Sequence, residues 1–463
     1  MRFLFTTLHY NEAEFYGRVG ALLQAQGHEV GHLSYSRRGA RLARGHGVQS
    51  WVLPDLLRAV SGDVDWEREG EAIVKRYDTP TLRDIYKTDR PCVGKPDAWC
   101  IERTVRHFRA IDGLFDEFRP DVVVPEVGSE MMRTVTHLVG LDRGVSVLFL
   151  FYTIFPNPLR LYADTMHAPI VPAEDVRPLD AEERLEVEEF IAAFTAKNKP
   201  IRPYRKARVG RENLRTWLSL IELRRGEDRD HEYLALEVGT VGTRARLRDA
   251  ARSFIARRLY TPLDRSRPFV YFPLHVVDDY KIKRVIPHCY DQASLIEQVA
   301  DSLPHGYDVV LKEHPMSIGR NGVKMLRRLK HIPNAQLVEP HTSSHQLMQE
   351  AAAVIVISST VGLEALMYGK PVLTMGQPFY GGYGVTLDVD SFREIREKVP
   401  QILAFEPDRE RILEFLHASM RRCYPGSPFL VDDSDENAEK LAQSLHTAAT
   451  EGVAQASSEP QVA

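Results

Sequence analysis

A four-residue motif, Lys312-Glu313-His314-Pro315, brings an ammonium group, a carboxylate and an imidazole together. It directly follows Asp308–Leu311, a run that predicts a buried strand. A histidine held at a strand end by a following proline can donate to a phosphate or protonate a leaving group. A lone histidine is usually structural, but the charged neighbours at this strand end favour a functional role for His314.

A second motif, Ser358-Ser359-Thr360-Val361-Gly362-Leu363-Glu364, follows an apolar strand and opens a predicted helix. Hydroxyl groups and free backbone N–H groups at a helix start bind phosphate well, and Gly362 removes a side chain where a ligand would approach. The simpler alternative is that Ser359 or Thr360 only caps the helix. A capping box fits poorly, because Glu364 lies four residues after Thr360 rather than three. We therefore favour phosphate binding.

A third cluster ends the first strand of the C-terminal half of the chain. The segment FPLHVVDD carries His275, Asp278 and Asp279, which could serve as acid, base or substrate contacts. Paired aspartates also suggest a metal ion, but no third ligand is placed by the sequence, so no metal site is expected. The motifs GxGxxG and GxxxxGK[ST] do not occur at the second motif, which argues against dinucleotide-binding and P-loop enzymes.

Two isolated residues are weaker candidates. Tyr380 lies in a glycine- and aromatic-rich loop, where its ring could stack on a base or sugar, or simply pack in an irregular loop. Glu126 directly follows the predicted strand Asp121–Val124 and its proline, where a carboxylate facing a cleft would lie. The alternative for Glu126 is a surface or helix-start position. His9, after the first predicted strand, is a further possible cleft residue.

The elements that position these residues alternate between strands and helices. At the N-terminus a strand at Arg2–Thr6 precedes a helix capped by Asn11, with Glu14 completing a capping box, and a second strand at Glu29–Leu33. Alternation returns after residue 263, with helices of about 8–12 residues between strands. This pattern predicts an α/β protein with two Rossmann-like domains facing a cleft, in which ligands bind at the carboxyl ends of the strands.

Length and composition agree with two large domains. The 463 residues exceed what one hydrophobic core usually holds. We predict an N-terminal Rossmann-like domain at 1–175, a charged helical connecting segment at 176–262, a C-terminal Rossmann-like domain at 263–430, and a terminal helix with a disordered tail at 431–463. The connecting segment is rich in arginine between Arg202 and Arg267, and is read either as solvated helices or as a basic face for an anionic surface.

The charge and cysteine content exclude several classes of protein. The 60 lysines and arginines nearly balance 64 aspartates and glutamates, giving a net charge of −4, so no nucleic-acid partner is expected. Four cysteines are too few for a disulfide framework in a chain of this length, which favours the cytoplasm. The longest apolar run, Gly144–Phe155, is shorter than the about 20 residues of a membrane-spanning helix. We expect a cytoplasmic protein with at most peripheral contact to the cytoplasmic face of a membrane.

Five short motifs together resemble the bacterial capsule polysaccharide synthesis family, which includes Kdo transferases. Their order and spacing match over roughly residues 268 to 390, whereas the first domain resembles the family only loosely. The motifs are FPLH (Phe272–His275), KEHP (Lys312–Pro315), SSTVGLEAL (Ser358–Leu366), GKPV (Gly369–Val372) and GQPFY (Gly376–Tyr380).

The resemblance implies a metal-independent glycosyltransferase of the GT-B type, with a CMP- or UDP-linked sugar as substrate and no cofactor. It implies that His314 contacts the donor phosphate, that Ser358 and its neighbours cradle it, and that Glu313 or Glu364 holds the nucleoside. The sugar would be Kdo or a related acidic sugar, and the acceptor a capsule or cell-envelope glycan or glycolipid. The general base that removes the proton of the acceptor hydroxyl would be Glu126 as the first candidate, and Asp278 or Asp279 as the second.

The complete set of predicted site residues has two parts. The catalytic candidates are Glu126, His275, Asp278 and Asp279, and the nucleotide-sugar-binding candidates are Lys312, Glu313, His314, Pro315, Ser358, Ser359, Thr360, Gly362, Glu364 and Tyr380. Two other functions remain open at this stage: a nucleotide-sugar epimerase with a similar fold, and a binding protein that has kept the fold and lost the chemistry.

Overall fold

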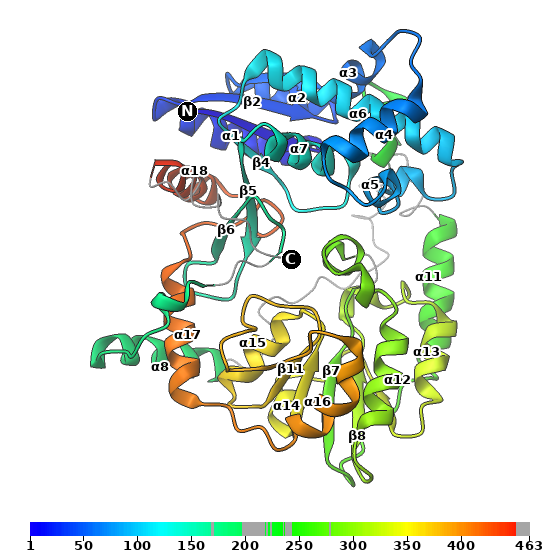
Figure 1. Cartoon of the computed structure of the whole chain (residues 1–463), viewed down its shortest axis with the longest axis vertical. Coiled ribbons are helices and arrows are strands. Elements are labelled where there is room, and N and C mark those ends of the chain that lie inside the picture. Colours follow the sequence, from blue (N-terminus) through cyan, green and yellow to red (C-terminus); the bar gives the residue numbers. More distant parts are fainter. Residues whose placement is uncertain are drawn as a thin grey trace. The chain divides into compact units, whose positions relative to one another are not determined.

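The computed structural model describes residues 1–167, 171–196, 218, 221–222, 225–234, 236, 243–276 and 279–450. It divides into two compact units, each with its own sheet (Figure 1). The first unit comprises Met1–Met166, Gly210–Gly242 and Cys423–Ala463, and the second comprises His167–Val209 and Thr243–Arg422.

The first unit is built on a six-stranded sheet with the order β3-β2-β1-β4-β5-β6. All pairings are parallel except that of β5 with β6. The strands are β1 (Arg2–Thr7), β2 (Glu29–Ser34), β3 (Gln49–Val52), β4 (Val122–Pro125), β5 (Ser146–Tyr152) and β6 (Leu159–Ala163). The helices are α1 (Tyr10–Ala25), α2 (Arg37–Gly45), α3 (Leu53–Ala59), α4 (Trp66–Arg76), α5 (Leu82–Tyr86), α6 (Asp97–Phe118), α7 (Met131–Asp142) and α18 (Asp435–Thr450).

The second unit repeats this order with a fully parallel sheet, β12-β11-β10-β7-β8-β9. Its strands are β7 (Phe269–Pro273), β8 (Asp308–Lys312), β9 (Ala335–Val338), β10 (Ala353–Val356), β11 (Val372–Thr374) and β12 (Leu387–Asp388). Its helices are α8 (Ala181–Ala196), α11 (Thr243–Ala256), α12 (Gln292–Ser302), α13 (Val323–Lys330), α14 (Ser344–Glu350), α15 (Thr360–Met367), α16 (Ile395–Ile402) and α17 (Arg409–Arg421). The predicted pair of doubly wound α/β domains is confirmed.

Burial explains the apolar sequence of the strands. Every residue of β7, β8 and β10 is buried, because helices cover both faces of a doubly wound sheet. The predicted strands at the start of the chain, Arg2–Thr6 and Glu29–Leu33, each extend one residue further than predicted.

The predicted start of the first helix was wrong. Helix α1 begins at Tyr10, and its N-cap is His9 rather than Asn11. The carboxylate that satisfies the free N–H groups is Glu12, which accepts from the backbone of Leu8 at 2.7 Å and of His9 at 3.2 Å. The Asn11–Glu14 pattern satisfied the same spacing rule two residues too late, so His9 has a capping position.

The division of the chain differs from the predicted domain borders. The expected connecting segment 176–262 is shared between the two units, and residues 202–217, at the start of its arginine-rich stretch, lie outside the described residues. The terminal helix does not follow the second unit: α18 buries Leu441 and Leu445 in the first unit's core, beside Phe15 of α1. The terminal helix predicted within 431–463 is α18, and residues 451–463 lie outside the described residues.

Candidate functional site

The candidate site lies at the carboxyl ends of three adjacent strands in the second unit. Because β7 pairs with β8 on one side and β10 on the other, the loops after these strands share one edge of the sheet. These loops carry His275, Lys312–His314 and Ser358–Thr360. The direction of strand order reverses between β7 and β10, and doubly wound sheets bind their ligands outside such a switch point. The structure therefore brings together the first three motifs of the sequence.

His275 joins two of these loops across the switch point. Its Nε2 accepts the backbone N–H of Ser358 at 3.3 Å, and its own backbone N–H donates to Gln292 Oε1 at 2.8 Å. Burial lowers the pKa of His275 to about 4, so the ring is neutral near pH 7. A neutral imidazole that already accepts at Nε2 carries its proton on Nδ1. This geometry favours a positioning role over the acid–base role predicted from sequence.

The His314 ring differs from the His275 ring in the nitrogen that accepts a hydrogen bond. Its Nδ1 accepts the backbone N–H of Met316 at 3.2 Å, and Pro315 begins the short 3₁₀ turn that His314 caps. Burial and then the Lys312 charge lower the pKa of His314, whereas Asp279 opposes this shift. The neutral ring consequently carries its proton on Nε2, the form that donates a hydrogen bond to an anionic oxygen.

The two residues before His314 lie in different environments. Lys312 Nζ donates to the backbone oxygen of Thr342 at 3.1 Å and to Ser344 Oγ at 2.5 Å, and burial lowers its pKa to about 8. Glu313 is fully buried, and its two carboxylate oxygens accept from Tyr260 and Asn321. Glu313 thus anchors its loop, and the nucleoside role suggested for Glu313 or Glu364 is better suited to Glu364.

The start of α15 presents the hydroxyl groups of the second motif. Ser359 is the N-cap, and its Oγ accepts the backbone N–H of Val361 at 3.2 Å, while Thr360 is exposed. Burial raises the pKa of Glu364 from 4.5 to about 7, although the Thr360 hydroxyl, 3.5 Å away, and the Lys312 charge oppose the shift. The site therefore contains a lysine and a glutamate that both titrate near neutral pH.

The structure changes the interpretation of Gly362 and Tyr380. The Tyr380 ring is only 1% exposed, and its hydroxyl donates to the backbone oxygen of Ser359. A Cβ atom at Gly362 would lie 2.3 Å from this hydroxyl. Gly362 therefore makes room for a tyrosine of the same unit, and the ring of Tyr380 is not available to stack on a base or sugar. The sequence could not distinguish these cases, because either role requires a glycine and an aromatic residue.

The paired aspartates are only partly described. Asp278 lies outside the described residues, and Asp279 Oδ1 accepts the backbone N–H of Lys281 at 2.9 Å. Asp279 also contributes electrostatically to His275 and His314, which places it in the same cluster. Across the described ranges, no group of three or more His, Cys, Asp or Glu side chains is arranged to hold a metal ion.

Glu126 lies at the corresponding switch point of the first unit, after β4. It is buried and accepts a hydrogen bond from the Tyr16 hydroxyl. Nearby, the Arg133 guanidinium contacts Glu12 at 2.7 Å and Glu130 at 3.1 Å. Burial, and then the Glu12 charge, raise the pKa of Glu126 to about 7, against the opposing effect of Arg133. Glu126 is therefore neither a surface nor a helix-start residue, but part of a closed polar network.

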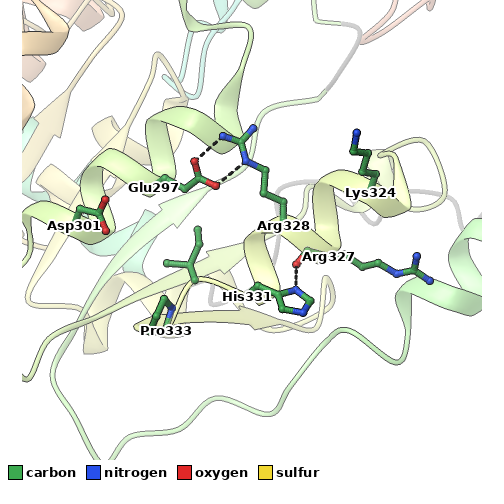
Figure 2. A pocket seen from close by; sticks show the side chains of 8 residues that line it. Glu297, Asp301, Lys324, Arg327, Arg328, His331 and Pro333 are labelled. Carbon is green, nitrogen blue, oxygen red and sulfur yellow. Dashed lines mark hydrogen bonds and ion pairs between the residues drawn. The ribbon is translucent and has the colours of Figure 1, made fainter.

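A surface depression of about 490 Å³ is lined by residues that come before and after the Lys312–Pro315 motif in the sequence. Helices α12 and α13 and the loop after α13 line it, with Glu297, Asp301 and Lys324 among the lining residues (Figure 2). Arg328 donates to both oxygens of Glu297 at 2.6 Å, which closes one side of it with an ion pair. None of the predicted site residues lines this depression.

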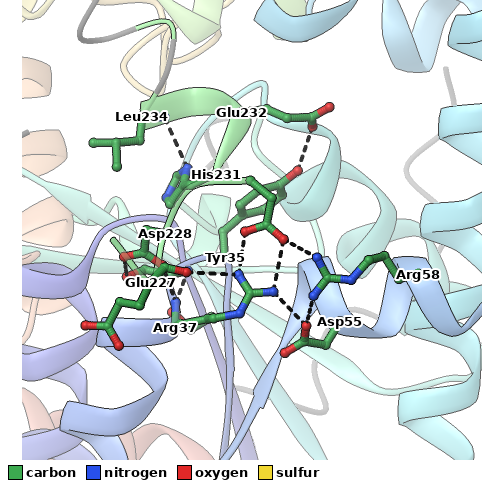
Figure 3. Close-up of polar contacts among 12 residues, drawn as sticks. Tyr35, Arg37, Asp55, Arg58, Glu227, Asp228, His231, Glu232 and Leu234 are labelled. Atoms are coloured by element: carbon green, nitrogen blue, oxygen red, sulfur yellow. Dashed lines mark hydrogen bonds and ion pairs between the residues drawn. The ribbon is translucent and has the colours of Figure 1, made fainter. Parts of the chain in front are cut away.

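An acidic segment, residues 225–234, docks within the first unit and was not among the predicted sites (Figure 3). Buried Asp228 accepts from the Ser36 hydroxyl at 2.7 Å and the Arg37 backbone N–H at 2.5 Å. His231 donates from Nε2 to the backbone oxygen of Leu8 at 2.7 Å, and Tyr233 donates to Asp89 at 2.7 Å. The acidic run EDRDHE could have indicated this docking, because the arginines that follow β2 offer it positively charged partners.

The fold and the site define a doubly wound α/β protein with a candidate anion site at the switch point of its second unit. Residues 227–414 match the family model described as "Capsule polysaccharide biosynthesis protein". This match confirms the predicted resemblance over a segment that contains all the site motifs of the second unit.

Two curated relatives cover a shorter part of the chain. Protein FixF of Sinorhizobium fredii is 29% identical over 127 residues, which are 27% of this chain and 30% of FixF. Capsule polysaccharide modification protein LipA of Neisseria meningitidis serogroup B is 27% identical over 130 residues, which are 28% of this chain and 18% of LipA. The chain thus spans less than a third of the length of these relatives.

Solved structures with detectable similarity have low sequence identity. The β-Kdo 2,7 transferase of Thermosulfurimonas dismutans KpsC is 19% identical with a TM-score of 0.35, covering 77% of this chain and 98% of that one. UDP-GlcNAc 2-epimerase from Neisseria meningitidis is 12% identical with a TM-score of 0.26, covering 97% and 100%. Within the part of the chain that the structure covers, we find no helix with the length and apolarity needed to cross a bilayer.

Proposed function

We propose that the protein is a GT-B type glycosyltransferase of capsule or cell-envelope synthesis, with a CMP- or UDP-linked acidic sugar as donor and a glycan or glycolipid as acceptor. The observation that carries the proposal is the meeting of His314, Lys312 and the start of α15 at one switch point. A neutral donor, a cation and a helix N-terminus are the groups that stabilise a departing phosphate without a resident cofactor.

The chemistry assigns each group a role. The acceptor hydroxyl oxygen attacks the anomeric carbon of the sugar, and the bond from that carbon to the phosphate oxygen breaks. The leaving nucleotide keeps the electron pair, so negative charge grows on its phosphate. His314 Nε2–H and the hydroxyls of Ser359 and Thr360 would donate to those oxygens, and Lys312 would add positive charge.

Glu364 would bind the nucleoside rather than the reacting atoms. It lies one helical turn after Thr360, which places the nucleoside beside the phosphate-binding end of α15. At pH values above its pKa of about 7, its carboxylate can accept hydrogen bonds from ribose hydroxyl groups. His275 would hold the β7 and β10 loops in register through its bond to Ser358.

The acceptor proton requires a base, and two carboxylates remain candidates. Glu126 has a pKa of about 7, which suits a general base near neutral pH. Asp279 lies in the cluster with His314 and is less buried. We propose Asp279, because it lies in the unit that carries the phosphate-binding groups, whereas Glu126 is buried in the polar network of the first unit and bonded to Tyr16.

Nucleotide binding provides the direct test. Thermal unfolding is measured with CMP-, UDP-, GDP- and dTDP-sugars for the wild-type protein and for His314→Ala. We expect a CMP- or UDP-sugar to raise Tm, and the variant to lose that rise. His331→Ala is a matched control, because His331 is an exposed histidine of the same unit whose Nδ1 bonds only locally, to Arg327 O at 2.6 Å.

Each result discriminates between functions. An unchanged Tm rise in His314→Ala would contradict the assigned role of His314. Turnover of a nucleotide-sugar without any acceptor would replace the transferase with the epimerase alternative. Binding without turnover in the presence of capsule acceptors would indicate a protein that has kept the fold and lost the chemistry.

A further inference from the structure

Helix α11 exposes an apolar face to solvent. Leu247 is 70% exposed, Phe254 59% and Ile255 39%, whereas Ala256 is buried in the core of the second unit. Leu247 and Phe254 are seven residues apart, which places them two turns apart on the same side of the helix. With Ala251 between them, they form a stripe that points away from the buried side of α11.

Arginines surround this stripe. Arg258, one turn after Phe254, places its guanidinium carbon 5.3 Å from the centre of the Phe254 ring. Arg248 and Arg257 are exposed and lie to either side of the stripe at 100° per residue. The acidic side chain in this part of α11 is Asp249, which pairs with Arg248 at 3.1 Å. The exposed side of α11 is therefore both apolar and positively charged.

The opposite side of α11 is already packed. The backbone oxygen of Asp249 lies so close to the loop before α13 that a Cβ atom at Gly319 would be 2.5 Å from it. Helix α13, which contacts α11, carries exposed Lys324 and Arg327, and these add to the positive field (Figure 2). The packed side fixes the helix, so the apolar stripe is held on the surface.

We propose that α11 docks on an anionic phospholipid bilayer, lying in the plane of the headgroups. Apolar side chains bordered by arginines match the acyl boundary and the phosphate layer of such a membrane. The 14 residues of α11 extend only about 21 Å, too short to cross a bilayer. A second copy of this chain fits less well, since self-pairing would bring two arginine-rich borders together. This inference uses no residue of the candidate site and does not depend on the proposed function.

Vesicle binding tests the proposal. The full chain is sedimented with phosphatidylcholine vesicles that contain, or lack, phosphatidylglycerol. We expect binding to the anionic vesicles that is at least about tenfold stronger, and that weakens as salt rises. Leu247→Ser combined with Phe254→Ser should reduce that binding at least about tenfold, because it removes the inserted apolar groups.

Matched variants separate this surface from general effects. Leu185 and Tyr290 are 55% and 53% exposed elsewhere on the same unit, so Leu185→Ser with Tyr290→Ser should bind as wild type. Likewise, Arg257→Glu with Arg258→Glu should abolish binding, whereas Arg393→Glu with Arg396→Glu, also exposed, should not. Wild-type binding by the Leu247/Phe254 variant would overturn the proposal. A lipid-free dimer that this variant dissociates would also overturn it, by identifying a self-association surface.

Discussion

The two units share one strand order but use their switch points differently. In the first unit, β1 and β4 meet at a buried polar network in which Tyr16 donates to Glu126 and Arg133 pairs with Glu12. In the second unit, the loops after β7 and β10 are joined by the hydrogen bond from the Ser358 backbone N–H to His275, next to the exposed start of α15. Both places hold a glutamate whose pKa burial raises to about 7.

The difference shows how one topology can serve stability and binding at equivalent positions. Buried groups that are paired inside a unit are shielded from a ligand, whereas hydroxyls at a helix start can still bind one. We therefore expect changes in the first network to alter mainly folding, and changes in the second cluster to alter mainly nucleotide affinity.

Replacing Arg133 should give the largest effect. Arg133→Met leaves the buried carboxylates of Glu12 and Glu130 without their cation, so we expect a loss of about 3–5 kcal/mol in the free energy of unfolding. Urea denaturation measures it. The matched change in the second unit, Lys312→Met, should lose less stability, because Glu364 can stay protonated, but should weaken nucleotide binding. Equal losses of stability would remove the distinction between the two switch points.

The second-largest effect should be the change of the free energy of unfolding with pH that Glu126 causes. The folded pKa of about 7 is above the ordinary 4.5, so the folded state binds more protons between these values and stability falls as pH rises. This group should contribute a decrease of up to about 3 kcal/mol from pH 4.5 to 7. Glu126→Gln should lack that component and be relatively more stable at pH 8. Stability–pH curves that run parallel for the wild type and Glu126→Gln would contradict this contribution of Glu126.

Gly362→Ala should have an intermediate effect on stability. The added methyl group would meet the Tyr380 hydroxyl at 2.3 Å and ring atoms at 2.8 and 2.9 Å, so we expect a loss of about 1–3 kcal/mol. Tyr380→Phe removes the nearest atom and should recover part of this loss in the double variant. If Gly362→Ala instead leaves urea stability unchanged and abolishes nucleotide binding, the glycine serves ligand approach as the sequence suggested.

Thr360→Val should give the smallest change. The Thr360 hydroxyl is exposed and lies at the first position of α15, so its loss should leave Tm unaltered. One hydrogen bond to a phosphate oxygen should be lost, which corresponds to about 1.5–3 kcal/mol for a charged acceptor, and less where water replaces it. Calorimetric titration with the preferred nucleotide measures this difference. A fall in Tm with unchanged affinity would make Thr360 a capping residue only.

Most of the fold could be predicted from the sequence, because strands buried in a parallel sheet occur in the sequence as apolar runs. Asp308–Leu311, Arg2–Thr6 and Glu29–Leu33 were each located to within one residue of the observed strand. The domain borders could not be predicted. The spacing of Leu441 and Leu445 predicts that one face of α18 is buried, but it does not indicate against which unit that face packs.

The site was predictable in its residues and less so in their roles. Strand alternation could have separated Glu313 from Lys312 and His314, since neighbouring residues of an extended chain point to opposite sides. The bond between His275 and Ser358 depends on strand order, which no local pattern contains. The orientation of Tyr380 likewise depends on packing between a loop and a helix start, which is set by the whole unit.

The return of the chain to its first unit has a consequence for the order of folding. The apolar side of α18 completes a core that begins with Phe3 and Phe15, so ribosomes must synthesise the chain through α18 before that core can close. The second unit ends at Arg422 and needs none of the last helix. Contrary to the usual N-terminal-first order, we expect the later half to mature first during translation. Limited proteolysis of a released chain truncated after Arg422 should find the second unit protected and the first still sensitive; the reverse pattern would refute this order.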